Sequence, residues 1–143
     1  NANQFQTMAF NNGYLKMNYF DQMGTDSLAI NYKNNEAQVF WIKLKNKWLL
    51  GLESFDQVSF FNTLGLKEFE LRKPEPNVMF INRGFMENGI FPFLNKERKT
   101  VYFLDLYGNL LLKKPIDYEA LLAISGKYIV NKTNNRFHIY KVF

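Results

Sequence analysis

The sequence predicts an all-β protein, predominantly antiparallel and sandwich or barrel-like, with one short helix near residues 55–64; an α+β fold is the alternative. The 143 residues include fifteen Phe, eight Tyr and two Trp, which are residue types that pleated strands favour. Short apolar runs recur along the chain and are separated by Gly, Asn, Asp or Pro, as in antiparallel sheets. One domain is predicted over residues 3–143, because this length supports a single substantial core; Asn1 and Ala2 read as a tag remnant.

Alternating apolar and polar residues define the predicted strands, and turn-forming residues define their ends. The strands are predicted over residues 5–10, 14–20, 27–33, 37–44, 48–53, 67–73, 77–82, 89–94, 100–106, 109–114, 120–124, 127–132 and 136–142.

One predicted hairpin contains both tryptophans. A three-residue loop over 45–47 would place Leu44 opposite Trp48 and Trp41 opposite Gly51. This register puts the two tryptophans on opposite faces, with Trp41 lying over the bare backbone of the glycine.

The final hairpin is predicted to turn at Asn134 and Asn135, residues that tolerate a positive φ. It pairs Val130 with Ile139, and it puts His138 on the more polar face.

The predicted helix has both a start signal and a stop signal. Ser54 followed three residues later by Gln57 is the pattern of a capping box, and Gly65 suits a left-handed C-terminal cap. Apolar residues recur at helical spacing between these signals and are expected to face the core. They are Phe55, Val58, Phe61 and Leu64.

The segment from Lys73 to Pro76 breaks the strand pattern, because its two prolines enforce an extended connection. We interpret it as a crossover loop within the domain. Residues 101–109 followed by 127–142 have the rhythm of a four-stranded propeller blade. A closed propeller needs at least four blades, for which the chain is too short, and no family resemblance follows.

The formal net charge is +5, and all of the excess lies in residues 67–143. A basic surface can meet nucleic acid, an anionic membrane or an acidic protein. The absence of cysteine excludes disulfides, thiol catalysis and thiolate metal ligands. No apolar run reaches the length of a membrane-spanning helix. We expect a bacterial, extracytoplasmic protein, periplasmic or lipid-anchored, with a cytoplasmic location left open.

No catalytic, cofactor-binding or metal-binding residue is predicted. Asp21 and Asp26 flank Gly24, but Asp and Gly in a loop are usually turn formers. His138 is the only imidazole and lacks a serine in a nucleophile-elbow context.

Paired carboxylates could serve a glycosidase, but the sequence does not give their separation. The acids considered are Glu53, Asp56, Glu68, Glu70, Glu75, Glu87, Asp105 and Glu119.

Cations and aromatic residues alternate in the second half of the chain, and they supply a candidate patch for an anionic partner. The patch consists of Lys96, Arg98, Lys99, Lys113 and Lys114. From these features we expect a noncatalytic binding or assembly module with a protein partner. The alternatives are a single-stranded nucleic-acid binder and an intracellular inhibitor of the immunity-protein type.

Overall fold

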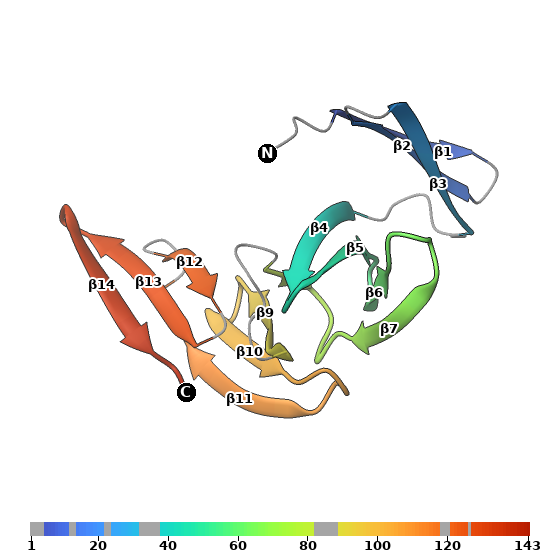
Figure 1. The fold of residues 1–143 in the computed structure, drawn as a ribbon. Coiled ribbons are helices and arrows are strands. Elements are labelled where there is room, and N and C mark those ends of the chain that lie inside the picture. The colour runs from blue at the N-terminus through green and yellow to red at the C-terminus, as the bar shows by residue number, and fades with distance from the viewer. Residues whose placement is uncertain are drawn as a thin grey trace.

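The protein folds almost entirely into antiparallel β-sheets (Figure 1). A computed structural model describes residues 5–11, 14–21, 24–31, 38–81, 89–117, 121–125 and 127–143. The described part contains no helix, and its sheets do not close on one another. The predicted antiparallel all-β class is therefore confirmed, and the α+β alternative is not.

Each sheet is formed by strands that follow one another in the chain. The N-terminal sheet contains β1 (Phe5–Asn11), β2 (Tyr14–Asp21) and β3 (Gly24–Asn31). The second contains β4 (Gln38–Leu44), β5 (Lys47–Glu53), β6 (Gln57–Phe61) and β7 (Lys67–Arg72). The third contains β8 (Val78–Phe80), β9 (Phe91–Asn95), β10 (Thr100–Leu104) and β11 (Leu110–Pro115). The last contains β12 (Leu121–Ser125), β13 (Tyr128–Thr133) and β14 (Arg136–Lys141). Every predicted strand thus has its counterpart within a few residues.

The β8–β11 sheet is covered on both faces. One face joins the β4–β7 sheet in a core that includes Phe60, Phe91 and Tyr102. The other face joins the β12–β14 sheet through residues such as Phe103 and Ile129. All five residues of β9 and all five of β10 are buried, because alternate side chains enter different cores. Packing between faces therefore holds the β4–β7, β8–β11 and β12–β14 sheets together. These three sheets follow one another in space in Figure 1.

Phe60 is at the centre of the first core and is fully buried. Its ring centroid lies 4.5 Å from that of Phe69, 5.6 Å from Phe91, 5.8 Å from Phe80 and 6.3 Å from Phe40. The rings come from both sheets, so aromatic packing supplies much of the contact between them.

The register of the β4–β5 hairpin differs by one residue from the prediction. Its loop has two residues, and Leu44 pairs with Lys47 rather than with Trp48. The left-handed backbone of Lys45, with φ of 52°, permits this tight turn. Trp41 and Trp48 consequently lie on the same face, and Trp48 is 52% exposed. The prediction of opposite faces was wrong.

Phe40 covers Gly51 in the β4–β5 hairpin, where Trp41 was expected. A Cβ atom placed on Gly51 would lie 2.2 Å from Cε2 of the Phe40 ring. The glycine is therefore required by its aromatic neighbour, although the sequence pointed to the wrong ring.

The predicted helix over 55–64 is wrong, because its middle is strand β6. The Ser54 amide and hydroxyl both donate to the carbonyl oxygen of Gln57, at 2.9 and 3.1 Å. These bonds close the β5–β6 turn instead of capping a helix. Phe55 is 72% exposed and Leu64 is also exposed, so the proposed helical stripe does not form a common core face.

Gly65 adopts a left-handed φ of 80°, as a helix cap would, but it lies in the β6–β7 turn. Its amide donates to the Asn62 carbonyl at 3.0 Å. The Asn62 side chain also accepts bonds from the amides of Leu64 and Leu66. Gly65 therefore has the left-handed backbone of the predicted cap, but the helix that it was predicted to end is absent, and the residue closes a turn between two strands.

The C-terminal hairpin has the predicted register. Val130 pairs with Ile139, and Asn131 pairs with His138. Asn134 and Asn135 have positive φ values of 47° and 60°, so the two-residue turn is built as the sequence indicated.

Candidate functional site

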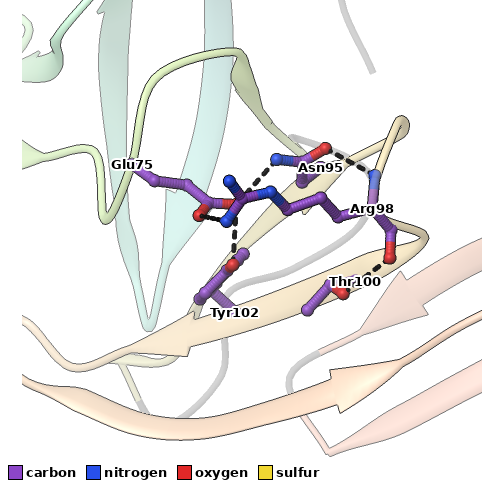
Figure 2. Close-up of polar contacts among 5 residues, drawn as sticks. All are labelled: Glu75, Asn95, Arg98, Thr100 and Tyr102. Atoms are coloured by element: carbon purple, nitrogen blue, oxygen red, sulfur yellow. Dashed lines mark hydrogen bonds and ion pairs between the residues drawn. The ribbon is translucent and has the colours of Figure 1, made fainter.

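A polar cluster around Glu75 joins the proline-containing loop to the β8–β11 sheet (Figure 2). Oε1 of Glu75 accepts hydrogen bonds from the Tyr102 hydroxyl and from Nδ2 of the Asn95 side chain, each at 2.6 Å. Oε2 accepts a bond from Nη1 of Arg98 at 2.9 Å. Oδ1 of the Asn95 side chain in turn accepts a hydrogen bond from the backbone N–H of Arg98 at 2.9 Å. These contacts hold the crossover loop against β9 and β10.

The donors around Glu75 favour its ionised form. The hydrogen bond from Tyr102 contributes most to lowering the pKa of the Glu75 carboxyl, aided by Asn95 and the charges of Arg98 and Lys113; burial opposes the shift. Nζ of Lys113 also lies 5.0 Å from the centre of the Tyr102 ring. The ionised carboxylate accepts hydrogen bonds from Asn95, Arg98 and Tyr102, and these charge-assisted bonds fasten the loop to β9, β10 and the turn between them.

Changing Glu75 to Gln should weaken the dependence of folding stability on acid pH. A carboxyl whose folded pKa is lowered stabilises the fold above its ordinary value of 4.5, and that stabilisation disappears as pH falls through the folded pKa. Urea unfolding from pH 7 to pH 3 measures the change. Glu97→Gln is a control for removing one negative charge from the adjacent turn. An unchanged acid slope in Glu75→Gln would contradict this role.

The five cations of the predicted patch do not form one continuous surface. Lys96, Arg98 and Lys99 lie in the β9–β10 turn. Lys113 pairs with Tyr102, whereas Lys114 pairs with the preceding residue of β10, so their side chains lie on opposite faces of β11. Glu75 also offsets the charges of Arg98 and Lys113. The structure thus brings together only part of the predicted patch.

A hollow of about 460 Å³ lies beside this turn. Its lining includes the exposed ring of Phe55, Met79 and the cations Lys73 and Lys96. Lys73 is already committed to Glu53, whose Oε1 lies 2.8 Å from its Nζ. The same oxygen accepts a hydrogen bond from the backbone N–H of Phe80 at 2.8 Å. The Glu53 carboxylate therefore links β5 to β8 and so joins the β4–β7 and β8–β11 sheets, with Lys73 as its counter-ion.

The other residues that were weighed as sites from the sequence make local contacts within their hairpins. His138 is opposite Asn131 and stacks on Tyr140 at a centroid distance of 6.3 Å. Asp21 pairs with Gly24 at the β2–β3 hairpin, and the residues between them lie outside the described part. Within the described residues, no group of three or more His, Cys, Asp or Glu could hold a metal ion. No described helix is long and apolar enough to cross a membrane.

Two of the carboxylates that were weighed as a glycosidase pair make contacts within their own strand or turn. Glu70 forms an ion pair with Lys67, three residues earlier on β7, where the register with β6 shifts by one residue. The Asp105 side chain accepts hydrogen bonds from the backbone N–H groups of Tyr107 and Asn109, each at 2.8 Å, within the β10–β11 turn. These acids stabilise local geometry in the structure.

The C-terminal hairpin exposes a face that the sequence did not indicate as a site. Tyr128, Val130, Phe137 and Ile139 share this face, according to the β13–β14 register. Phe137 is 66% exposed and Ile139 is 68% exposed. Ile129 points the other way, into the core shared with the β8–β11 sheet. Periodicity indicated two faces here, but only the packing shows which face is left uncovered. We call these four residues the outer face of the hairpin.

Positive charge surrounds the outer face. Lys132 pairs with Phe137 and Lys141 pairs with Tyr128, so both cations share this face. Nζ of Lys132 lies 5.9 Å from the centre of the Phe137 ring. Residues 127–143 contain four Lys or Arg and no Asp or Glu. The arrangement is an apolar centre with a basic rim, which resembles the layout of protein interfaces.

Comparison with known proteins identifies no family. No family model matches the sequence, and no curated protein matches it. Among solved structures, Hsv2 from Kluyveromyces lactis has a TM-score of 0.52 at 14% identity, covering 76% of this chain and 34% of that chain. Dihydro-heme d1 dehydrogenase NirN, in complex with DHE, has a TM-score of 0.54 at 10% identity, covering 98% and 36%.

The chain spans about a third of the length of these two structures. At such identities the likeness concerns the fold alone. It is a likeness to distant β-propeller-like proteins, in agreement with the succession of antiparallel sheets. The segments 101–109 and 127–142, whose rhythm suggested one blade, fall in different sheets, β8–β11 and β12–β14. The four-stranded sheets of the structure are β4–β7 and β8–β11.

Proposed function

We propose that this chain is a noncatalytic binding module whose partner is a protein, and that it binds through the outer face of the β13–β14 hairpin. The observation that carries the proposal is the exposure of Phe137 and Ile139 on a regular strand. Adjacent large apolar side chains on a sheet surface are typical of an interaction site. The basic rim favours a partner with acidic side chains around its contact surface.

The cluster around Glu75 supports a structural scaffold beneath such a surface. The Glu75 carboxylate accepts three hydrogen bonds. The Glu53 carboxylate forms an ion pair with Lys73 and accepts a hydrogen bond from the Phe80 N–H. These groups are engaged in joining segments of the fold. The proposal therefore assigns binding to the outer face and stability to the buried polar contacts.

Site-specific crosslinking tests the proposed surface. A photoreactive phenylalanine analogue at Ile139 should capture a protein that the same analogue at exposed Leu64 does not capture. The purified partner should then bind the Phe137→Ser/Ile139→Ser double variant at least tenfold more weakly than the wild type, a difference of about 1.4 kcal/mol. Phe55→Ser removes another exposed ring and is the matched control.

A single-stranded nucleic-acid binder is the competing function. A fluorescent oligothymidylate should bind weakly at ~0.15 M salt if the protein proposal is correct. Submicromolar binding that disappears when Lys96, Arg98, Lys99, Lys113 and Lys114 become Gln would support phosphate recognition instead. Equal partner affinity in the wild type and the outer-face double variant would also contradict our assignment.

A further inference from the structure

The β6–β7 turn and the β10–β11 turn have the same hydrogen bonding. Each begins with a residue whose side chain accepts bonds from the backbone N–H groups two and four positions later, Asn62 in the first turn and Asp105 in the second. Each has a left-handed glycine three positions after that residue, with φ of 80° at Gly65 and 83° at Gly108. In both turns the glycine N–H donates to the carbonyl of the first residue.

The strands that follow these turns carry a bulge at the same place. Glu68 is the extra residue of β7, and Leu111 is the extra residue of β11. The residue before each bulge, Lys67 or Leu110, pairs with the last residue of the third strand. The two fourth strands therefore have matching backbones and can be compared position by position.

The chemistry of the two fourth strands differs at these matching positions. β7 begins with the charged residues Lys67 and Glu68, whereas β11 begins with Leu110 and Leu111, which are 54% and 46% exposed. Charged side chains on an outer strand protect its edge from unwanted contacts. Since β7 shows that the same backbone accepts charge here, the fold does not require the two leucines.

The exposed apolar surface of β11 continues into the turn before it. Leu106 and Tyr107 are also exposed. We call Leu106, Tyr107, Leu110 and Leu111 the rim patch. β11 is the outermost strand of the sheet that is covered on both faces, and it lies along the border of the molecule in Figure 1. Packing among the described sheets therefore leaves the patch uncovered, and clustered apolar exposure of this kind is typical of interaction sites.

The charge beside the rim patch is positive. Lys113 and Lys114 follow it on β11, and residues 106–116 contain no Asp or Glu. The Asp105 carboxylate, just before the patch, is hydrogen-bonded within its own turn. A second copy of this chain, with its net charge of +5, would bring like charges together. Charge complementarity instead favours a partner that carries carboxylates.

We propose that the rim patch is a second interaction surface, which binds a partner protein through apolar side chains flanked by Asp or Glu. An apolar centre with a charged rim is the usual layout of such an interface. The rim patch belongs to a different sheet from the outer face of the β13–β14 hairpin. The inference therefore goes beyond the proposed function and does not depend on it.

The sequence of β7 supplies the test variant. Leu110→Lys/Leu111→Glu gives β11 the residues that β7 has at the matching positions, and we call it the rim variant. Its thermal unfolding should stay close to that of the wild type, because both side chains are exposed. Leu64→Lys/Leu66→Glu is the matched control, because it removes two exposed leucines from the β6–β7 turn.

The probe is a random dodecapeptide library displayed on phage and selected on the full chain. The enriched peptides should combine large apolar residues with Asp or Glu. The tightest of them, labelled for fluorescence anisotropy, should bind the rim variant at least tenfold more weakly than the wild type and should bind the control equally well. Its affinity should also fall between ~0.05 M and ~0.5 M salt, because salt screens the attraction to the lysines.

Crosslinking locates the peptide without changing the two leucines. A photoreactive phenylalanine analogue at Tyr107 should crosslink to the selected peptide, whereas the same analogue at exposed Leu64 should not. This measurement decides the location even if the rim variant does not fold.

The outcomes separate this inference from the proposed function. Enrichment of basic peptides, of no consistent sequence, or of peptides that bind the rim variant as well as the wild type would overturn the rim patch. Peptides lost only in Phe137→Ser/Ile139→Ser would support the outer face and overturn the rim patch. Self-association detected by sedimentation, or binding to phosphatidylserine vesicles, would overturn the proposed occupant if either were lost in the rim variant.

Discussion

Replacing Phe60 by Ala is expected to lower the free energy of unfolding by about 3–5 kcal/mol. The Phe60 side chain is fully buried and touches aromatic rings from both large sheets. Its loss would remove apolar contacts and leave a cavity that the surrounding rings can fill only in part. Since the free energy of unfolding of a domain is about 5–15 kcal/mol, this one substitution would remove a large fraction of the stability of the fold.

Chemical denaturation measures this effect, and Phe55→Ala is the matched control. Phe55 is 72% exposed, so its truncation should change stability by no more than about 0.5 kcal/mol. Equal losses in the two variants would contradict the position of Phe60 at the centre of the core.

Gly51→Ala should be destabilising by about 1–3 kcal/mol, because the added methyl group overlaps the Phe40 ring. The closest approach is 2.2 Å in the present geometry. Phe40 cannot move away freely, since its ring also packs against Phe60 and Phe80. Helix or strand propensity does not account for this expected loss.

A double-mutant cycle isolates the clash. Phe40→Ala alone removes core packing, but Gly51→Ala should cost much less in that background than in the wild type. The expected coupling is about 1 kcal/mol or more, within the range measured for neighbouring residues. Additive losses would show that the glycine is needed for another reason, such as its backbone conformation.

The strands were predictable because their determinants are local. Alternation and turn residues indicated nearly every strand, and the adjacent asparagines set the register of the last hairpin. The helix prediction failed because Ser54 and Gln57 can close either a helical turn or a tight strand connection. The shift in the β4–β5 register has a similar cause, because the left-handed conformation of Lys45 shortened the loop by one residue.

The candidate sites depend on contacts that are distant in the sequence. Glu75 meets Tyr102 only because the crossover loop returns to β10. Likewise, the alternation in β14 indicates two faces but does not indicate which one another sheet will cover. The exposed pair Phe137 and Ile139 could be recognised only after Ile129 was found in the core. Sequence spacing alone gives neither of these relationships.

The burial of the β8–β11 sheet on both faces affects how stability is distributed through the molecule. An end layer loses one neighbour when it separates, whereas this middle layer must lose two. The stack therefore behaves as a short one-dimensional series with nearest-neighbour coupling. Disruption within β9 or β10 would propagate in both directions, while fraying of β14 would leave the coupling between the two large sheets intact.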